Sequence, residues 1–201
     1  GSSCVKGQMA LRLLNITKYK PICAYRGTAV VKAAMERGEV SFFTASAAHL
    51  LGSGSFVDLH QRKLVYPIWQ SGILKPDGKI VRAPSVKGDV PTLLEVYKDV
   101  HGKAPKGVMW DTWKAFSLGM AKLTRTLVLP PGTPSDRVAA LRKGIKKMAR
   151  DPGFVRDWEK IFGQPIAPLL VDPAEGDRVK DDLTKPAPWQ GFVREFVWGK
   201  S

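Results

Sequence analysis

Short apolar runs alternate with stretches of helical periodicity through the first part of the chain. An apolar run bounded by turn residues predicts a buried strand, and apolar positions three or four residues apart predict a helix. The predicted strands are residues 22–25, 39–44 and 63–69. The predicted helices between them are residues 29–37, which Gly38 ends, and a short helix that follows Ser46 and ends at Leu51. Strands that alternate with helices predict a parallel sheet and an α/β fold.

The pattern changes after residue 70. Residues 71–90 are rich in Gly, Pro and Lys, and they predict a long loop with a turn at residues 75–78. A helix is expected to begin within residues 91–97, and Trp110, Trp113 and Phe116 then follow at a helical spacing of three. Such a stripe is typical of a core, although the same rings could close over a ligand.

The remaining segments predict one strand and several helices. Residues 124–129 predict the strand, and Thr133 with Pro134 predicts the capped start of a helix. This helix has an apolar stripe formed by Val138, Leu141, Ile145 and Met148. A basic face, typical of solvent exposure, lies opposite and consists of Arg137, Arg142, Lys143, Lys146, Lys147 and Arg150. Further helices are expected after Asp151 and Asp172, each of which precedes a proline.

A candidate binding site lies where the first predicted strand meets the first predicted helix. Tyr25, Arg26, Gly27 and Thr28 form this junction, with Thr28 as the expected helix cap. The first N–H groups of a helix have no intrahelical partner, and the helix dipole adds positive charge, so such a junction can hold an anion. An ordinary strand-to-helix turn with an exposed arginine has the same pattern, and that interpretation stays open.

A second junction repeats this arrangement at Thr44 and Ser46. In a parallel sheet both junctions lie at the carboxyl ends of the strands, where ligands bind. Ser2 and Ser3 are further candidates, because they stand in a small-residue loop that leads into a helix predicted from residue 8 or 9 to residue 15, and they can cap it or bind an anion. Alternatively, Gly1 and Ser2 are a remnant of cloning.

Charge narrows the class of partner. The 201 residues include 32 Lys and Arg against 18 Asp and Glu, which gives a net charge of +14. This length supports one large domain or two small ones. The charge favours carboxylates, phosphates, nucleic acid or a membrane surface. Apart from residues 137–150 the basic residues are spread along the chain, which is not typical of a nucleic-acid module.

The chain has no apolar run near the roughly 20 residues that span a bilayer. It opens on Gly1 without an initiator Met or the pattern of a signal peptide, so we expect that its N-terminus has been processed, engineered or cut. Cys4 and Cys23 lack CxxC spacing and the histidines are scattered, so no metal or other cofactor is expected. We expect the two cysteines to be reduced and buried, and a disulfide in an oxidising compartment is the alternative.

Several motifs together resemble the solute-binding proteins of tripartite tricarboxylate transporters. Residues 23–29 are similar to the Val-Pro-Tyr-Lys-Gly junction of that family, and residues 39–40 stand at its Gly-Gln-Val-Asp strand start. Residues 91–95 match Pro-Thr-x-x-Glu, and residues 130–134 match Pro-x-Gly-Thr-Pro. Residues 1–3 resemble the end of a Ser/Gly-rich ligand loop. The order and spacing of these motifs, over about residues 1–175, make the set specific.

The resemblance implies an α/β, periplasmic-binding-protein-like fold with two lobes and mostly parallel sheets, from which the N-terminal part of one lobe is missing. Residues 1–105 would form the ligand-binding lobe, and residues 106–201 the crossing segment and the C-terminal part of the other lobe. The implied function is to bind a small carboxylate and deliver it to membrane permease subunits. The implied ligand-binding residues are Ser2, Ser3, Tyr25, Arg26, Gly27, Thr28, Thr44 and Ser46, with Arg26 in place of the family's lysine.

We therefore expect a periplasmic receptor with no nucleic-acid partner. The alternative is a basic interaction or nucleic-acid-binding α/β module, which one continuous basic face would favour. An enzyme is disfavoured because no Ser/His/Asp group, metal cluster or paired-carboxylate motif stands out in the sequence. We also expect residues 124–129 and the apolar stripe after Pro134 to lack cover, unless a second chain or copy completes that lobe.

Overall fold

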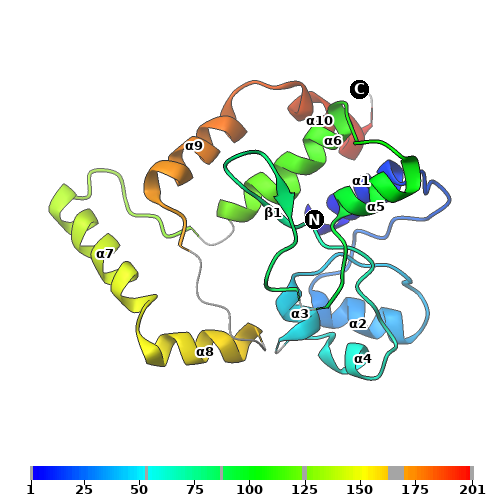
Figure 1. Ribbon diagram of the computed structural model, residues 1–201, viewed down its shortest axis with the longest axis horizontal. Coiled ribbons are helices and arrows are strands. Elements are labelled where there is room, and N and C mark those ends of the chain that lie inside the picture. Colours follow the sequence, from blue (N-terminus) through cyan, green and yellow to red (C-terminus); the bar gives the residue numbers. More distant parts are fainter. Residues whose placement is uncertain (1, 53, 87, 124–125, 163–169, 200–201) are drawn as a thin grey trace.

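The structure is a computed structural model that describes residues 2–52, 54–86, 88–123, 126–162 and 170–199. Figure 1 shows helices joined by long connections, with a single small hairpin near the centre. The hairpin pairs β1 (Ile73–Leu74) with β2 (Ile80–Val81) in antiparallel register, Ile73 opposite Val81 and Leu74 opposite Ile80. Its turn is the one predicted at residues 75–78, and the Gly78 N–H donates to the Lys75 carbonyl at 2.9 Å.

The first part of the chain forms α1 (Ser2–Leu13), α2 (Thr28–Glu36), α3 (Ala47–Leu51) and α4 (Val57–Gln61) before the hairpin. After the hairpin come α5 (Leu93–His101), α6 (Val108–Lys114), a π-helical turn η1 (Ala115–Gly119) and a 3-10 turn η2 (Met120–Leu123). The last helices are α7 (Ser135–Met148), α8 (Pro152–Phe162), α9 (Pro173–Thr184) and α10 (Pro188–Trp198).

The predicted α/β fold, with two lobes and parallel sheets, is wrong. Within the described residues the strand pairings are the antiparallel ladder of β1 and β2 and one separate parallel bridge, between Gln70 and Thr92. The three apolar runs of the first part pack side chains onto helices instead. Tyr25, Val40, Phe43 and Val65 all contact the cluster of Val31, Phe56 and Leu59, which lies around α2 and α4.

Residues 63–69 show why a parallel sheet does not form. A parallel strand is normally covered on both faces. Here Leu64, Tyr66 and Ile68 are 58%, 64% and 54% exposed, while the alternate residues Val65 and Trp69 are half-buried. The run is extended and covered on one side only, so its apolar composition does not make it the inner strand of a sheet.

The strand predicted at residues 124–129 is also wrong over its described part, residues 126–129, which is irregular. Leu127 is 76% exposed and Val128 is 82% exposed, so the expected lack of cover is confirmed for both. Residues 124 and 125 lie outside the described residues.

The main core joins α1, α5, α6 and η1. Met9, Leu93 and Trp113 are almost fully buried in it, and Trp110 stacks on Trp113 with ring centroids 5.1 Å apart. The prediction that these tryptophans form a core stripe is therefore confirmed. The half-buried Phe116 meets the ring of Trp189 edge-on at 5.9 Å, which brings α10 against the same core. The predicted boundary between two parts of the chain, residues 1–105 and 106–201, stays a prediction.

Local start signals explain several helices. Thr92 and Glu95 form a reciprocal capping box at α5, and the Asp172 carboxylate accepts from the Ala174 N–H at the start of α9. At α7 the predicted cap is wrong, because Pro134 occupies the cap position and the Thr133 hydroxyl donates to the Pro130 carbonyl at 2.8 Å.

Candidate functional site

A cavity of about 680 Å³ lies between α1 and the chain that returns alongside it. One wall comes from α1, through Ser3, Cys4, Gly7, Gln8 and Leu11. The other walls come from residues 18–31, which include the start of α2, and from residues 39–44. This volume falls within the range of about 300–1,000 Å³ that is usual for small-molecule sites.

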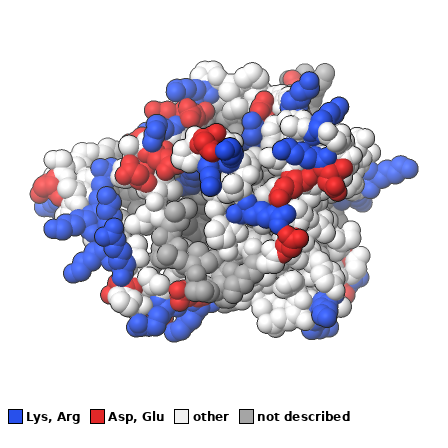
Figure 2. All heavy atoms as spheres, viewed as in Figure 1, with Lys and Arg blue, Asp and Glu red and all other residues white. Residues whose placement is uncertain are grey.

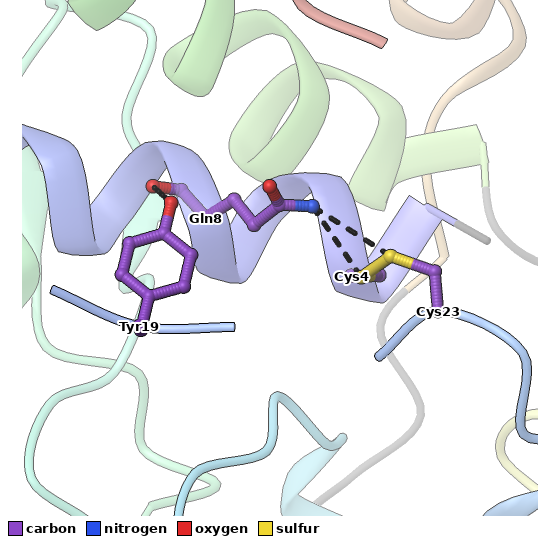
Figure 3. Close-up of a disulfide and its surroundings, with 4 residues drawn as sticks. All are labelled: Cys4, Gln8, Tyr19 and Cys23. Carbon is purple, nitrogen blue, oxygen red and sulfur yellow. Dashed lines mark hydrogen bonds between the residues drawn. A yellow bond between two sulfur atoms is a disulfide. The ribbon is translucent and has the colours of Figure 1, made fainter. Parts of the chain in front are cut away.

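A disulfide between Cys4 and Cys23 fastens the returning chain to α1, so the predicted reduced state is wrong. The two Cα atoms are 5.7 Å apart, although the residues are 19 positions apart in the sequence. In Figure 3 the Gln8 side chain reaches from α1 toward the sulfur atoms. Its amide N–H lies 3.5 Å from the Cys4 sulfur and 3.6 Å from that of Cys23. The Tyr19 hydroxyl donates to the Gln8 carbonyl at 3.4 Å, a second tie between the same segments.

The N-terminus of α2 opens on this cavity. Gly27 occupies the cap position with φ of 98°, which a residue with a side chain rarely adopts. The prediction that Thr28 caps the helix is wrong, because the Thr28 hydroxyl instead shares a hydrogen bond of 3.1 Å with Ser55. The first-turn N–H groups of α2 have no intrahelical partner, and the helix dipole adds positive charge beside them.

Tyr25 and Glu39 lie on the cavity wall and contact each other. The Tyr25 hydroxyl donates to a Glu39 oxygen at 3.2 Å, and the Arg37 guanidinium donates to the other oxygen at 2.6 Å. These partners lower the pKa of Glu39, with the hydrogen bond from Arg37 as the main cause. Desolvation, followed by the bond to Glu39, raises the pKa of Tyr25, so its hydroxyl keeps its proton at neutral pH.

Lys18 and Lys20 also line the cavity, and both are exposed at its rim. Sequence reasoning missed them, because it placed the site at a sheet edge rather than beside α1. A local signal was present, since two lysines flank Tyr19 directly before Pro21. Two cations at the rim give the cavity a positive entrance, which the single acid Glu39, already bound to Arg37, does not cancel.

Part of the cavity lining is aromatic, through Phe42 and Phe43. Phe42 packs on Trp69 with ring centroids 5.3 Å apart, and Phe43 packs on Phe56 at 5.5 Å. Gly7 of α1 approaches this wall closely, since a Cβ there would stand 2.8 Å from the Thr44 hydroxyl oxygen. The absence of a side chain at Gly7 therefore lets α1 and residues 42–44 approach each other.

The structure brings together five of the eight predicted ligand-binding residues: the cavity is lined by Ser3, Tyr25, Gly27, Thr28 and Thr44. Arg26 and Ser46 are exposed and are not part of this lining. Ser46 stands at the cap position of α3 without a side-chain hydrogen bond to the helix. Ser2 begins α1, and its side chain lies outside what the structure describes.

Comparison of the chain with family models, curated proteins and solved structures finds no match. Among the described residues, no helix is long and apolar enough to cross a membrane. The described part of the chain also contains no group of three or more His, Cys, Asp or Glu side chains that could hold a metal ion. The disulfide is compatible with an oxidising compartment outside the cytoplasm.

Proposed function

We propose that this protein is a periplasmic solute receptor that binds a small carboxylate in the cavity beside the disulfide. The observation that carries the proposal is the composition of this cavity. Lys18 and Lys20 stand at its rim, the N-terminus of α2 opens on one side, and the aromatic side chains of Phe42 and Phe43 are part of its lining. Each polar feature favours a negative group, and together they favour one at the same place.

A bound carboxylate would use the donors that the cavity offers. One oxygen accepts from N–H groups at the start of α2, those of the cap residue Gly27 and of Thr28, where the helix dipole favours negative charge. The lysines supply full positive charges at the entrance, and their flexible side chains can follow ligands of different size. The rings of Phe42 and Phe43 would contact the apolar part of the ligand.

Delivery of the carboxylate to permease subunits of a tripartite tricarboxylate-type transporter is part of the proposal. This step rests on the motif resemblance at residues 23–29, 91–95 and 130–134, whereas the binding step rests on the cavity. The periplasmic location has one independent support, because a Cys4–Cys23 disulfide persists in an oxidising compartment.

Ligand-induced stabilisation tests the binding step. The full chain is melted with a panel of mono-, di- and tricarboxylates and aromatic acids, and isothermal titration calorimetry then gives the affinity for any acid that shifts the melting temperature. A ligand at about 100 times its Kd adds about 2.7 kcal/mol, which corresponds to a shift of roughly 5–10 °C for a chain of this size. If none of these acids shifts the melting temperature, the proposal fails.

Two pairs of variants locate the site. Lys18→Gln with Lys20→Gln should weaken binding at least tenfold, and Lys103→Gln with Lys106→Gln, which changes exposed lysines outside the cavity, is the matched control. Thr28→Pro removes one N–H donor at a helix position that tolerates proline, and Thr28→Ala removes only the hydroxyl. Weaker binding in Thr28→Pro than in Thr28→Ala supports binding at the helix N-terminus. Equal binding by both would place the carboxylate elsewhere.

A further inference from the structure

Helix α7 presents an apolar stripe that the described part of the protein does not bury. Leu141 is 50% exposed, Met148 is 42% exposed, and Val138 and Ile145 are half-buried. An amphipathic helix of a globular protein normally turns such a stripe to the core. The expectation that this stripe lacks part of its cover is therefore confirmed. In Figure 1 the helix lies at the edge of the molecule, next to α8 in the chain and away from the main core around α6.

The segment that leads into α7 adds to this exposed apolar surface. Leu127, Val128 and Leu129 are 76%, 82% and 44% exposed. Pro130 and Pro131 follow at once, and they remove the backbone N–H groups that a continuing strand would use. Residues 130–137 separate this segment from Val138, the first residue of the α7 stripe. Both groups are exposed, so an extended surface such as a membrane can contact both.

The same helix carries a strong positive charge. Figure 2 shows Lys and Arg side chains gathered along the side of the molecule that α7 occupies in Figure 1. These exposed side chains are Arg137, Arg142, Lys143, Lys146, Lys147 and Arg150. The ion pairs nearest to them in sequence, within the described residues, are Lys122–Glu175 and Lys160–Asp157. The basic side chains of α7 therefore keep their charge available to a partner.

Two of the basic side chains of α7 border its apolar stripe, whereas Lys143 and Lys147 lie across the helix from it. Arg142 and Lys146 follow Val138 at steps of four residues, so these two side chains border the apolar stripe. A shallow hollow of about 640 Å³ lies along this border. Its lining combines Val138 and Ala139 with Arg142, Lys143 and Lys146, and also includes Thr133 and Ser135.

We propose that α7 and residues 127–129 bind an anionic membrane surface, with α7 lying along the interface. Negatively charged headgroups complement the six basic side chains named above, while the exposed leucines and valine enter the boundary between headgroups and acyl chains. Nucleic acid fits less well, because it offers no apolar layer to cover Leu127 and Val128, and α7 has no aromatic side chain for stacking. This inference does not depend on the carboxylate cavity.

Vesicle co-sedimentation of the full chain tests the proposal. The chain should bind vesicles of phosphatidylcholine with phosphatidylglycerol, lose that binding as salt is raised, and bind phosphatidylcholine alone only weakly. Equal binding to both kinds of vesicle, or binding to neither, overturns the proposal. Duplex DNA is added as a competitor, and displacement of the protein at DNA phosphate concentrations well below that of the lipid also overturns it.

Two sets of variants assign the contact to α7 and its preceding segment. The charge variant carries Lys143→Gln, Lys146→Gln and Lys147→Gln. Each lost lysine weakens binding to the anionic vesicles roughly fivefold, so this variant should bind about a hundredfold more weakly. Its matched control carries Lys98→Gln, Lys103→Gln and Lys106→Gln, which are exposed elsewhere. Circular dichroism verifies that both fold. An equal loss in the control would show that net charge, not α7, is responsible, and would overturn the assignment.

The apolar contribution has its own control. Leu127→Ser with Val128→Ser should weaken binding to the anionic vesicles at least tenfold, and the binding that remains should be more sensitive to salt. Leu64→Ser with Ile68→Ser changes two side chains that are also more than half exposed, outside the proposed surface. If both pairs reduce binding equally, or neither does, residues 127–129 do not enter the membrane and the proposal is wrong.

Discussion

Removal of the Cys4–Cys23 disulfide should cost a large part of the stability of this protein. The bond joins residues 19 positions apart, so it restricts the unfolded chain by closing a loop of that length. Such a closure contributes about 3 kcal/mol at about 25 °C. Because total stability of a domain is about 5–15 kcal/mol, the loss would be between a fifth and more than half of it.

The wall of the cavity should respond as well. Residues 18–25 are tied to α1 by this bond and by the Tyr19 hydrogen bond to the Gln8 carbonyl. Without the bond, Tyr19 and the lysines beside it are held less firmly, and ordering them again opposes ligand binding. Any carboxylate that binds the oxidised protein should therefore bind the reduced protein more weakly.

Urea unfolding at neutral pH measures the effect on stability. The oxidised protein is compared with the reduced protein and with Cys4→Ala/Cys23→Ala, and reductant can reach the bond because Cys23 is exposed. With an m value of about 2 kcal/mol/M, the midpoint should fall by about 1.5 M urea on reduction. The m value should rise, since the unfolded chain without its cross-link exposes more surface.

Agreement between the reduced protein and the double variant is the internal control, because both lack the cross-link and differ only in two thiol groups. An unchanged midpoint on reduction would refute the reasoning. So would alkylation of both cysteines in the unfolded protein before any reductant is added, since that result shows free thiols.

Two further predictions concern the hairpin and α5. Gly72→Ala should lower the free energy of unfolding by about 2 kcal/mol or more, and Gly78→Ala by only about 1 kcal/mol. Both glycines have φ near +80°, but only a methyl group at residue 72 would meet a backbone atom, the Val81 carbonyl oxygen at 2.6 Å. Equal losses of stability for the two variants in urea unfolding would contradict this. The hydrogen bond from Arg82, followed by that from the Thr92 N–H, lowers the pKa of Glu95 from 4.5 to about 2. Because its folded pKa is depressed, the stability that Glu95 contributes is present above pH 4.5 and is lost as the pH falls toward 2. The Glu95 side chain is 45% exposed, so solvent screening reduces the stability that it contributes to about 1 kcal/mol. Glu95→Gln should therefore destabilise the protein by that amount at neutral pH and by almost nothing near pH 2. A loss of stability that does not change with pH would contradict the assignment.

The starts of α5 and α9 and one turn could be predicted in detail from the sequence because their signals are local. The interactions of Thr92 with Glu95 at α5, and of Asp172 with the start of α9, lie within a few residues. The turn at residues 75–78 likewise depends on its own glycine and proline. The apolar stripe of α7 was also predicted, since its periodicity is a property of the segment. Its lack of cover was expected only from the missing lobe that the family resemblance implied, because periodicity does not say what packs on a stripe.

Tertiary structure decided where the apolar runs pack. Residues 22–25, 39–44 and 63–69 have the composition of strands, but a strand is stabilised by a partner that the run itself does not specify. In the folded chain some of their side chains pack against the cluster around α2 and α4, and the runs, which lie within the described residues, form no strand pairs with one another. The family resemblance reinforced the same error, because its motifs describe turns and helix starts and leave the pairing of strands open.

The candidate site divides in the same way. Tyr25, Gly27 and Thr28 could be found from sequence because they surround a helix start, which creates unpaired N–H groups wherever it occurs. The placement of Lys18 and Lys20 at the same cavity could not, and neither could the Cys4–Cys23 bond. Both depend on how the chain turns back along α1 after Leu13, and that path is set by contacts between residues distant in sequence, which no local pattern encodes.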